Sequence, residues 1–103
     1  MLMILAITRM QALPEKRVEL IQTMASLSGS IRKKKGCRHW DFFQSIEDEN
    51  RLFLLEEWDA QDSLMTHQKS SHFKVIQGAM NLLKEPHERM FYTILHPARI
   101  EEI

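Results

Sequence analysis

The segment that most constrains the fold is residues 2–11, because apolar side chains occupy both of its alternating sets of positions. One set consists of Leu2, Ile4, Ala6, Thr8 and Met10, and the other includes Met3, Leu5 and Ile7. A strand with this pattern is typically buried on both faces of its sheet. We therefore expect a strand here, in a sheet that must be covered on two sides.

The next segments predict a helix followed by a hairpin. Apolar residues recur at helical spacing between residues 14 and 34, and we expect Gly36 to end that helix. Residues 37–46 and 51–58 are rich in aromatic and aliphatic side chains, which is typical of strands. The polar turn at 47–50 is short, so these two strands should pair as an antiparallel hairpin.

The last part of the chain repeats the order of helix and strand. A short helix is expected after Asp59, followed by a helix whose apolar stripe begins at Phe73, and then by a strand over residues 88–95. The resulting order, β-α-β-β-α-β, predicts a ferredoxin-like α+β fold with an antiparallel sheet and both helices on one face. With 103 residues, the chain is the size of one domain, which we take to span 1–103.

The helices of such a fold cover one face of the sheet, whereas the strand segments are apolar on both. In residues 51–58, for example, Phe53 and Leu55 oppose Leu52 and Leu54. An exposed apolar face of this size usually marks an interface, so we predict a homodimer in which two sheets face each other. The 14 basic and 14 acidic residues leave no net charge, which lowers self-repulsion between copies and argues against a nucleic-acid partner.

Composition and motifs exclude several classes of protein. The single cysteine, Cys37, excludes an intrachain disulfide and a cysteine-rich zinc site. No apolar run approaches 18 residues, and the N-terminus lacks a signal-peptide pattern, so we expect no membrane span and a cytoplasmic location. Gly-rich phosphate loops are absent, and we interpret the basic run over 32–35 as a solvated helix end.

Glu56 and Trp58 are the first candidates for a site. Both share strand parity with Leu52 and Leu54, so they should face the helices. Trp58 has two interpretations: a core residue that closes the apolar layer, or a pocket wall that stacks on a flat aromatic ligand. The seven methionines likewise either fill gaps in the core or line an adaptable pocket.

His67 and His72 are the second candidates. They are five residues apart, across an expected helix break, and no cysteine or nearby glutamate accompanies them. A metal-binding pair on one helix would be spaced four apart, so we expect no metal site. Each histidine could instead be a neutral hydrogen-bonding group, a general acid or base, or an ordinary capping or surface residue.

A family resemblance follows from this part of the chain. The motif consists of Leu55-Glu56-Glu57-Trp58-Asp59, then Leu64, His67, Ser70 and His72-Phe73-Lys74. It resembles the antibiotic biosynthesis monooxygenase domain family, which includes bacterial quinol monooxygenases, and Gly36-Cys37 with Trp40 resembles the opening of that family's second strand. The resemblance implies a dimeric α+β barrel with a cavity between sheet and helices in each subunit.

The resemblance also implies a reaction. Family members with known chemistry oxygenate electron-rich phenols or quinols with O2, without flavin, haem or metal, and the deprotonated substrate itself reduces O2. Haem-degrading relatives need an asparagine and a haem-ligating histidine, and the corresponding positions here are Thr8 and Gln77. We therefore expect no cofactor and a small aromatic substrate.

The resemblance assigns roles to residues of this sequence. Trp58 would shape the pocket, and His67 or His72 would handle protons, so these three are the predicted catalytic residues. The predicted substrate-binding residues are Thr8, Glu56, Phe73, Ile76 and Tyr92. Two alternatives to a cofactor-independent monooxygenase stay open: a non-catalytic dimeric module that binds a small ligand, and an isomerase-type enzyme with one of the two histidines as base.

Overall fold

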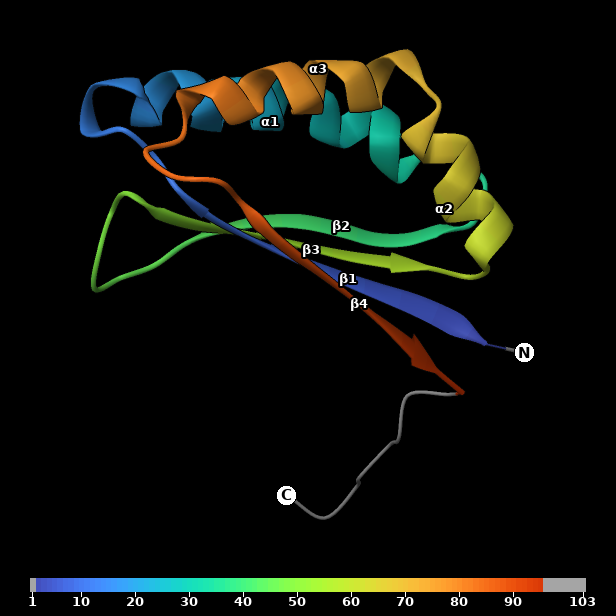
Figure 1. Ribbon diagram of the computed structural model, residues 1–103. Coiled ribbons are helices and arrows are strands. Elements are labelled where there is room, and N and C mark those ends of the chain that lie inside the picture. The colour runs from blue at the N-terminus through green and yellow to red at the C-terminus, as the bar shows by residue number, and fades with distance from the viewer. Residues whose placement is uncertain (1, 96–103) are drawn as a thin grey trace.

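The computed structural model describes residues 2–95 and has the expected order of elements (Figure 1). Its strands are β1 (Met3–Gln11), β2 (Cys37–Gln44), β3 (Arg51–Trp58) and β4 (Glu88–Ile94). Its helices are α1 (Arg17–Arg32), α2 (Gln61–Gln68) and α3 (Ser71–Ala79), with short 3-10 turns at Pro14–Lys16 and Met80–Leu82. The ferredoxin-like α+β prediction is therefore confirmed.

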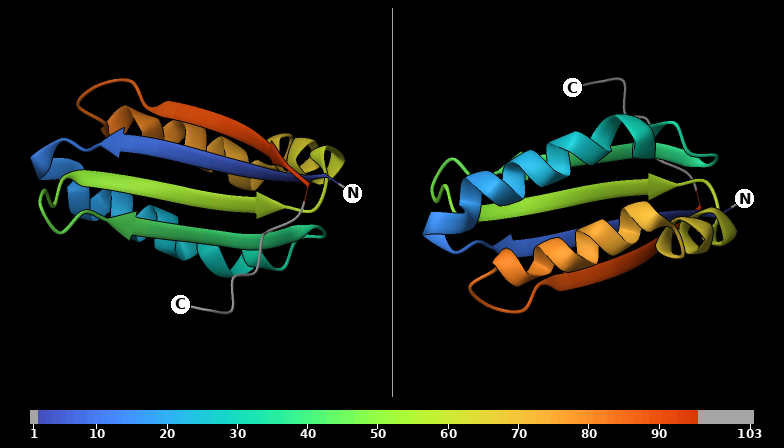
Figure 2. Two further views of the ribbon diagram at one scale, coloured as in Figure 1. Left: turned by 90° about the horizontal axis from the view of Figure 1, so that it is seen from below. Right: turned by 90° about the horizontal axis from the view of Figure 1, so that it is seen from above.

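The four strands form one antiparallel sheet in the order β2-β3-β1-β4. Helices α1 and α3 lie side by side over the same face of this sheet, and α2 packs at the end where β3 finishes (Figures 1 and 2). The register places Thr8 of β1 opposite Leu54 of β3 and Arg89 of β4. Since directly paired residues point to the same face, these three side chains all lie on the helix-covered side.

The core lies between the sheet and the two long helices. Helix α1 contributes Leu20, Met24 and Ile31, all fully buried, and α3 contributes Ile76. From the sheet they meet a layer that consists of Ile4, Met10, Trp40, Leu52, Leu54 and Trp58. Burying each such side chain contributes about 1.5–3 kcal/mol, so this single layer is the main source of stability.

The opposite face of the sheet carries mostly apolar side chains. Among residues 2–95, no helix lies over this face (Figure 2). Phe43, Met90 and Tyr92 are exposed on it, with exposed fractions of 50%, 40% and 44%. Leu5 and Phe53 lie on the two central strands of the same face and are half-buried. The predicted pattern of one covered and one open apolar face is thus present, and the homodimer stays a prediction.

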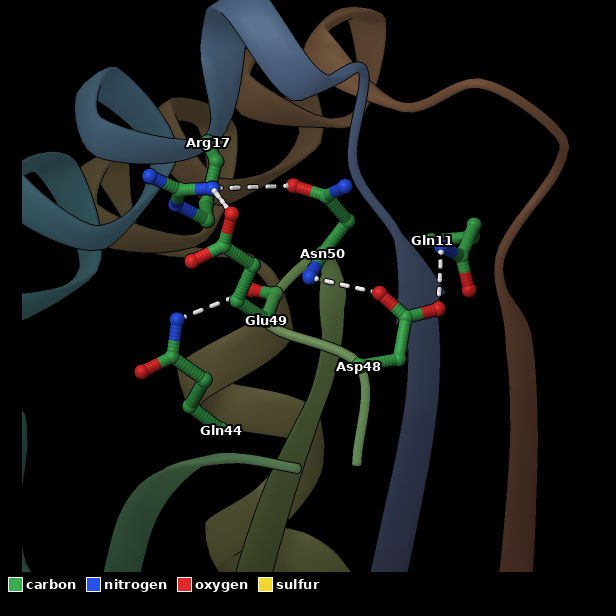
Figure 3. A network of polar contacts seen from close by, with 6 residues as sticks. All are labelled: Gln11, Arg17, Gln44, Asp48, Glu49 and Asn50. Atoms are coloured by element: carbon green, nitrogen blue, oxygen red, sulfur yellow. Dashed lines mark hydrogen bonds and ion pairs between the residues drawn. The ribbon is translucent and has the colours of Figure 1, made fainter. Parts of the chain in front are cut away.

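The turn between β2 and β3 does more than connect two strands, as Figure 3 shows. Asp48 accepts hydrogen bonds from the backbone N–H of Asn50 at 2.9 Å and from Gln11 Nε2 of β1 at 3.1 Å. These two bonds hold the pKa of the Asp48 carboxyl below its usual value. Arg17 of α1 contacts Glu49 Oε1 at 2.7 Å and Asn50 Oδ1 at 3.2 Å. The turn therefore ties the first turn of α1 to the end of β1.

The link between α1 and β2 depends on Gly36. Its φ of 83° lies in the left-handed region, and a side chain here would collide with Ser63 and Asp59 of the segment that begins α2. The Gly36 carbonyl also accepts a hydrogen bond from the Asp59 backbone N–H at 2.8 Å. The connection that carries Lys34 is in this way held against the start of α2.

Candidate functional site

A cavity of ≈ 100 Å³ lies between the sheet and helices α1 and α3. Most of its wall is apolar and consists of Met10, Met24, Leu54, Phe73, Ile76 and Met80. Gln77 and His87 also line it, and because both are exposed, they mark its opening to solvent. Three of the lining residues are methionines, whose flexible side chains adapt to a ligand.

Neighbouring strands supply the polar end of the cavity, where Thr8, Glu56 and Arg89 meet. Thr8 and Arg89 are direct register partners, and Glu56 pairs with Ala6, one step along the same face of the sheet. The period of two along a strand thus brings a hydroxyl, a carboxylate and a guanidinium from β1, β3 and β4 to one place.

Glu56 is a buried carboxylate whose two oxygens each have a donor. Its Oε1 accepts from Trp58 Nε1 at 3.2 Å, and its Oε2 accepts from Arg89 Nη2 at 2.9 Å. Burial raises the pKa of Glu56, while the Arg89 charge and the two hydrogen bonds oppose that rise. The guanidinium itself lies 5.2 Å from the ring centre of Phe73 and 5.0 Å from that of Phe91.

His67, near the end of α2, is fully buried at the junction of the helices and the sheet. Its ring stacks on Trp58 with centroids 4.9 Å apart and meets the edge of Phe73 at 5.6 Å. Its Nδ1 lies 2.8 Å from Lys34 Nζ. Burial, followed by the charges of Lys34 and Arg89, lowers the pKa of His67 to about 4, so its imidazole is neutral at pH 7.

Three buried polar atoms of this cavity have no hydrogen-bond partner within residues 2–95: Thr8 Oγ1, His67 Nε2 and Arg89 Nε. The other such side-chain atom in this part of the chain is Trp40 Nε1, which lies outside the cavity lining. Buried polar groups in folded proteins are nearly always paired, with protein, water or ligand. Three of them around one cavity give it a polar end that could pair with water or with a polar atom of a ligand.

Five of the residues predicted from sequence line the cavity: Thr8, Glu56, His67, Phe73 and Ile76. Trp58 does not line it. Instead it lies behind the wall, fully buried, where it stacks on His67 and donates a hydrogen bond to Glu56. Its interpretation as a core residue is therefore the one that the structure favours, and it orients two lining residues.

His72 and Tyr92 are not brought to the cavity. His72 lies half-buried in the first turn of α3 and is not among the lining residues. Tyr92 is the register partner of Leu5 and therefore points from the other, open face of the sheet. The strand alternation that placed Arg89 on the covered face could have placed Tyr92 on the open one.

Sequence reasoning missed Arg89, His87 and Lys34. The alternation of β4, combined with its pairing to β1, is a signal from which Arg89 could have been found. For Lys34 the interpretation as a solvated helix end was wrong, because it turns inward and contacts both His67 and Ser70. No local pattern distinguishes it from Lys33 and Lys35, which are exposed.

Within residues 2–95, no group of three or more histidine, cysteine, aspartate or glutamate side chains is arranged to hold a metal ion. None of the helices described in this range has both the length and the apolar character needed to cross a membrane.

Comparison with known proteins places the chain in one family. The model of the family described as antibiotic biosynthesis monooxygenase matches residues 3–79. A Bacillus subtilis protein named "Putative monooxygenase YcnE" is 30% identical over 74 residues, 71% of this chain and 78% of that protein. A Haloquadratum walsbyi protein named as heme-binding is 27% identical over 78 residues, 75% of this chain and 15% of that protein. The crystal structure of a conserved Methanosarcina mazei protein has a TM-score of 0.84 and 32% identity, over 89% of this chain and 92% of that one.

Haem does not fit this cavity. Its volume of ≈ 100 Å³ is on the order of the ~150 Å³ apolar cavity that takes up one benzene molecule, whereas haem is a macrocycle of four pyrrole rings around an iron. Gln77, at the position that the resemblance assigns to the iron ligand, presents an amide at the opening. The cavity has the dimensions of a one-ring compound.

Proposed function

The chain belongs to the antibiotic biosynthesis monooxygenase family, and from this premise we propose that it oxidises a one-ring phenolic or quinol substrate with O2, without a bound cofactor. The observation that carries the proposal is the cavity with one apolar end and one polar end. The apolar end would hold the ring. The unpartnered atoms of Thr8, His67 and Arg89 would bind its oxygen.

In this reaction the substrate supplies all the electrons. For a hydroquinone, one atom of O2 enters the ring, the other leaves as water, and the ring is oxidised to a hydroxyquinone, so that four electrons pass from substrate to O2. The ring transfers electrons to O2 far more readily as an anion. The protein must therefore stabilise the ionised oxygen, accept or exchange its proton and exclude bulk water.

The residues of the cavity divide these tasks in the proposal. Met10, Met24 and Ile76 pack around the ring and keep water away. Glu56 is the candidate proton acceptor, because burial raises its pKa and makes its carboxylate a stronger base than an exposed one. Of the residues predicted to be catalytic, His67 contacts the substrate, Trp58 supports His67, and His72 lies outside the cavity lining.

The test is O2 consumption with a panel of one-ring quinols and phenols. Monooxygenation consumes one O2 per substrate and puts one atom of labelled oxygen into the product. Simple autoxidation makes hydrogen peroxide instead, and added catalase would then return half of the consumed O2. Enzyme-dependent uptake that is insensitive to catalase and is lost in His67→Gln, with little loss in His72→Gln, supports the proposal. No such uptake across the panel contradicts it.

The same unpartnered atoms favour a second candidate, a module that binds a small ligand without transforming it. Such a module would be stabilised by its ligand, because binding to the folded state raises the melting temperature. A ligand from the panel that raises Tm without O2 uptake or product would identify this case. An isomerase would convert its substrate equally well under anaerobic conditions.

We also propose that the open sheet face is covered by a second copy of the chain. Phe43, Met90 and Tyr92 are exposed there beside the half-buried Leu5 and Phe53, and exposed apolar patches that extend across a whole sheet usually mark an interface. Light scattering at micromolar concentration should give twice the mass of the 12.2 kDa chain. A monomeric mass would refute this part.

A further inference from the structure

We propose that Lys34 holds His67 in the tautomer that carries its proton on Nε2, so that the neutral imidazole donates a hydrogen bond to an oxygen anion bound in the cavity and does not act as its base. The identity of that anion as an ionised phenol or quinol rests on the proposed function. The tautomer is a property of the ligand-free protein and can be measured by itself.

The first step is the direction of the hydrogen bonds around Lys34. Its Nζ lies 2.7 Å from Ser70 Oγ and 2.8 Å from His67 Nδ1. The Ser70 hydroxyl proton is already donated to the His67 carbonyl at 2.6 Å, and the same oxygen caps α3 by accepting from the Phe73 backbone N–H. Toward Lys34, therefore, Ser70 Oγ can only accept.

The second step is the proton on the imidazole. A lysine ammonium has three donors and no acceptor, so the ring nitrogen that faces it must be the unprotonated one. In neutral imidazole the other nitrogen, Nε2, then carries the proton. Lys34, Arg89 and the nearby His72 all oppose a second proton on the ring, while Glu56 is already paired with Arg89.

The third step is what Nε2 addresses. His67 lines the cavity, its Nδ1 is occupied by Lys34, and its Nε2 is buried without a partner in the described chain. Arg89 Nε, which is also a donor, and Thr8 Oγ1 are likewise buried without a hydrogen-bond partner in the described chain. Two N–H groups and a hydroxyl around one cavity give it a surplus of hydrogen-bond donors, which suits an oxygen acceptor.

The charge of that oxygen follows from the groups around it. Lys34 and Arg89 bring two positive charges to this end of the cavity, whereas Glu56 brings one negative charge. Lys34 also polarises the imidazole, because its ammonium draws electron density toward Nδ1 and makes the Nε2 proton a better donor. Fixed donors and a surplus of positive charge in a buried site stabilise an anion more than a neutral carbonyl or hydroxyl.

The opposite role for His67 needs a different proton arrangement. To accept a proton from substrate, Nε2 would have to be bare, with the ring proton on Nδ1 donated to an uncharged Lys34 amine. Burial does lower the pKa of Lys34, so this arrangement becomes more accessible as pH rises. In this arrangement Nε2 of His67 would present a lone pair to the cavity instead of a proton. A lone pair repels an anion, so His67 could not then bind one.

Nuclear magnetic resonance of the 15N-labelled, ligand-free protein at pH 7 tests the tautomer directly, because protonated and bare ring nitrogens resonate in separate regions. We expect the His67 signal, assigned by its loss in His67→Gln, to show a protonated Nε2 and a bare Nδ1. In Lys34→Met the preference should shift, and the pKa of His67 should rise as the neighbouring charge is removed. Lys34→Arg should restore the wild-type pattern because it keeps a cationic donor.

The matched control is Lys35→Met, which removes an exposed lysine one position away and should change neither reading. A wild-type His67 protonated on Nδ1, or a Lys34→Met variant with an unchanged tautomer and pKa, would overturn the inference. If Lys34→Met fails to fold, a pH titration of the wild type and of Lys34→Arg still tests the inference. Both proteins should show the Nε2-protonated tautomer at pH 7. Lys34→Arg should keep it to a higher pH, because arginine stays charged where lysine loses its proton.

The anion is tested with 4-nitrophenol, a one-ring probe whose absorbance distinguishes the ionised form from the neutral one. We expect the protein to bind the phenolate and to lower the apparent pKa of the bound probe. Lys34→Met and His67→Gln should weaken phenolate binding about tenfold or more, as expected for a buried hydrogen bond to a charged group. Preference for the neutral phenol, or no binding of either form at millimolar concentration, overturns this part. Failure of O2 uptake alone would refute the proposed reaction and leave the tautomer result standing.

Discussion

Replacing Arg89 by methionine should test the electrostatics of the cavity most severely. Arg89 Nη2 lies 2.9 Å from Glu56 Oε2, with only 15% of the arginine side chain and 1% of the glutamate side chain exposed. Methionine keeps much of the volume but leaves Glu56 as a buried carboxylate with Trp58 Nε1 as its remaining donor. Removing one partner of a buried ion pair costs about 3–5 kcal/mol, because an uncompensated charge stays behind.

That cost is a large fraction of the stability of a domain of this size, which is on the order of 5–15 kcal/mol. At about 4–8 °C of melting temperature per kcal/mol, Arg89→Met should melt more than about 10 °C below the wild type at pH 7. Urea unfolding gives the free energy directly. The double variant Glu56→Gln/Arg89→Met should recover part of the loss, because its amide carries no charge and its oxygen can still accept from Trp58 Nε1.

The pH dependence distinguishes a lost charge partner from lost packing. Burial already raises the folded-state pKa of Glu56, so its stability contribution falls as pH rises from the unfolded value of about 4.5 toward the folded one. Loss of the Arg89 charge raises that pKa further and also relieves the depression of the His67 pKa. Both changes favour the folded variant in acid. The loss of unfolding free energy in Arg89→Met should therefore be smaller at pH 5 than at pH 8. An equal deficit at both pH values would refute the electrostatic reasoning.

Four further changes have defined outcomes. Gly36→Ala should lower the unfolding free energy by about 1–3 kcal/mol in urea titrations, because a Cβ at φ 83° collides with Ser63 and Asp59; a neutral result would contradict the backbone argument. Trp58→Phe should cost about 2–3 kcal/mol, mainly through the lost hydrogen bond to Glu56, and circular dichroism melting that shows no loss would refute it. His67→Gln should remove a dependence of stability on pH between about 4 and 6.5, on the order of 3 kcal/mol in the wild type, where stability rises with pH because the unfolded chain binds the extra proton. Phe43→Asp, on the open sheet face, should yield a monomeric mass in light scattering if the dimer forms there, and an unchanged dimer would place the interface elsewhere.

The fold was predictable because its determinants are local in the chain. Periodicity marks each strand and helix, and the short turn at 47–50 permits only an antiparallel hairpin. The predicted strand 51–58 matches β3 residue for residue, while the strand predicted over 37–46 ends earlier, at Gln44. The expected helix from 14 begins as a 3-10 turn and becomes α-helical at Arg17.

Part of the site was predictable for the same reason. Strand parity placed Thr8 and Glu56 on the helix-covered face, and the stripe of α3 placed Phe73 and Ile76 over them. The residue type also marked Glu56 as a candidate, because burying a glutamate in an otherwise apolar strand face is costly unless a partner pairs with it. What pairs with it, Arg89, lies 33 residues further along the chain.

The sequence by itself determined which elements form, in which order, and that the sheet is apolar on two faces with helices for only one. Only the tertiary structure decided how the polar groups meet. It turned Lys34 inward to His67 and paired Arg89 with Glu56. The physical reason is that periodicity acts between neighbours in the chain. A hydrogen bond or an ion pair depends on distances of about 3 Å between atoms that the chain brings together only when the sheet and helices have packed.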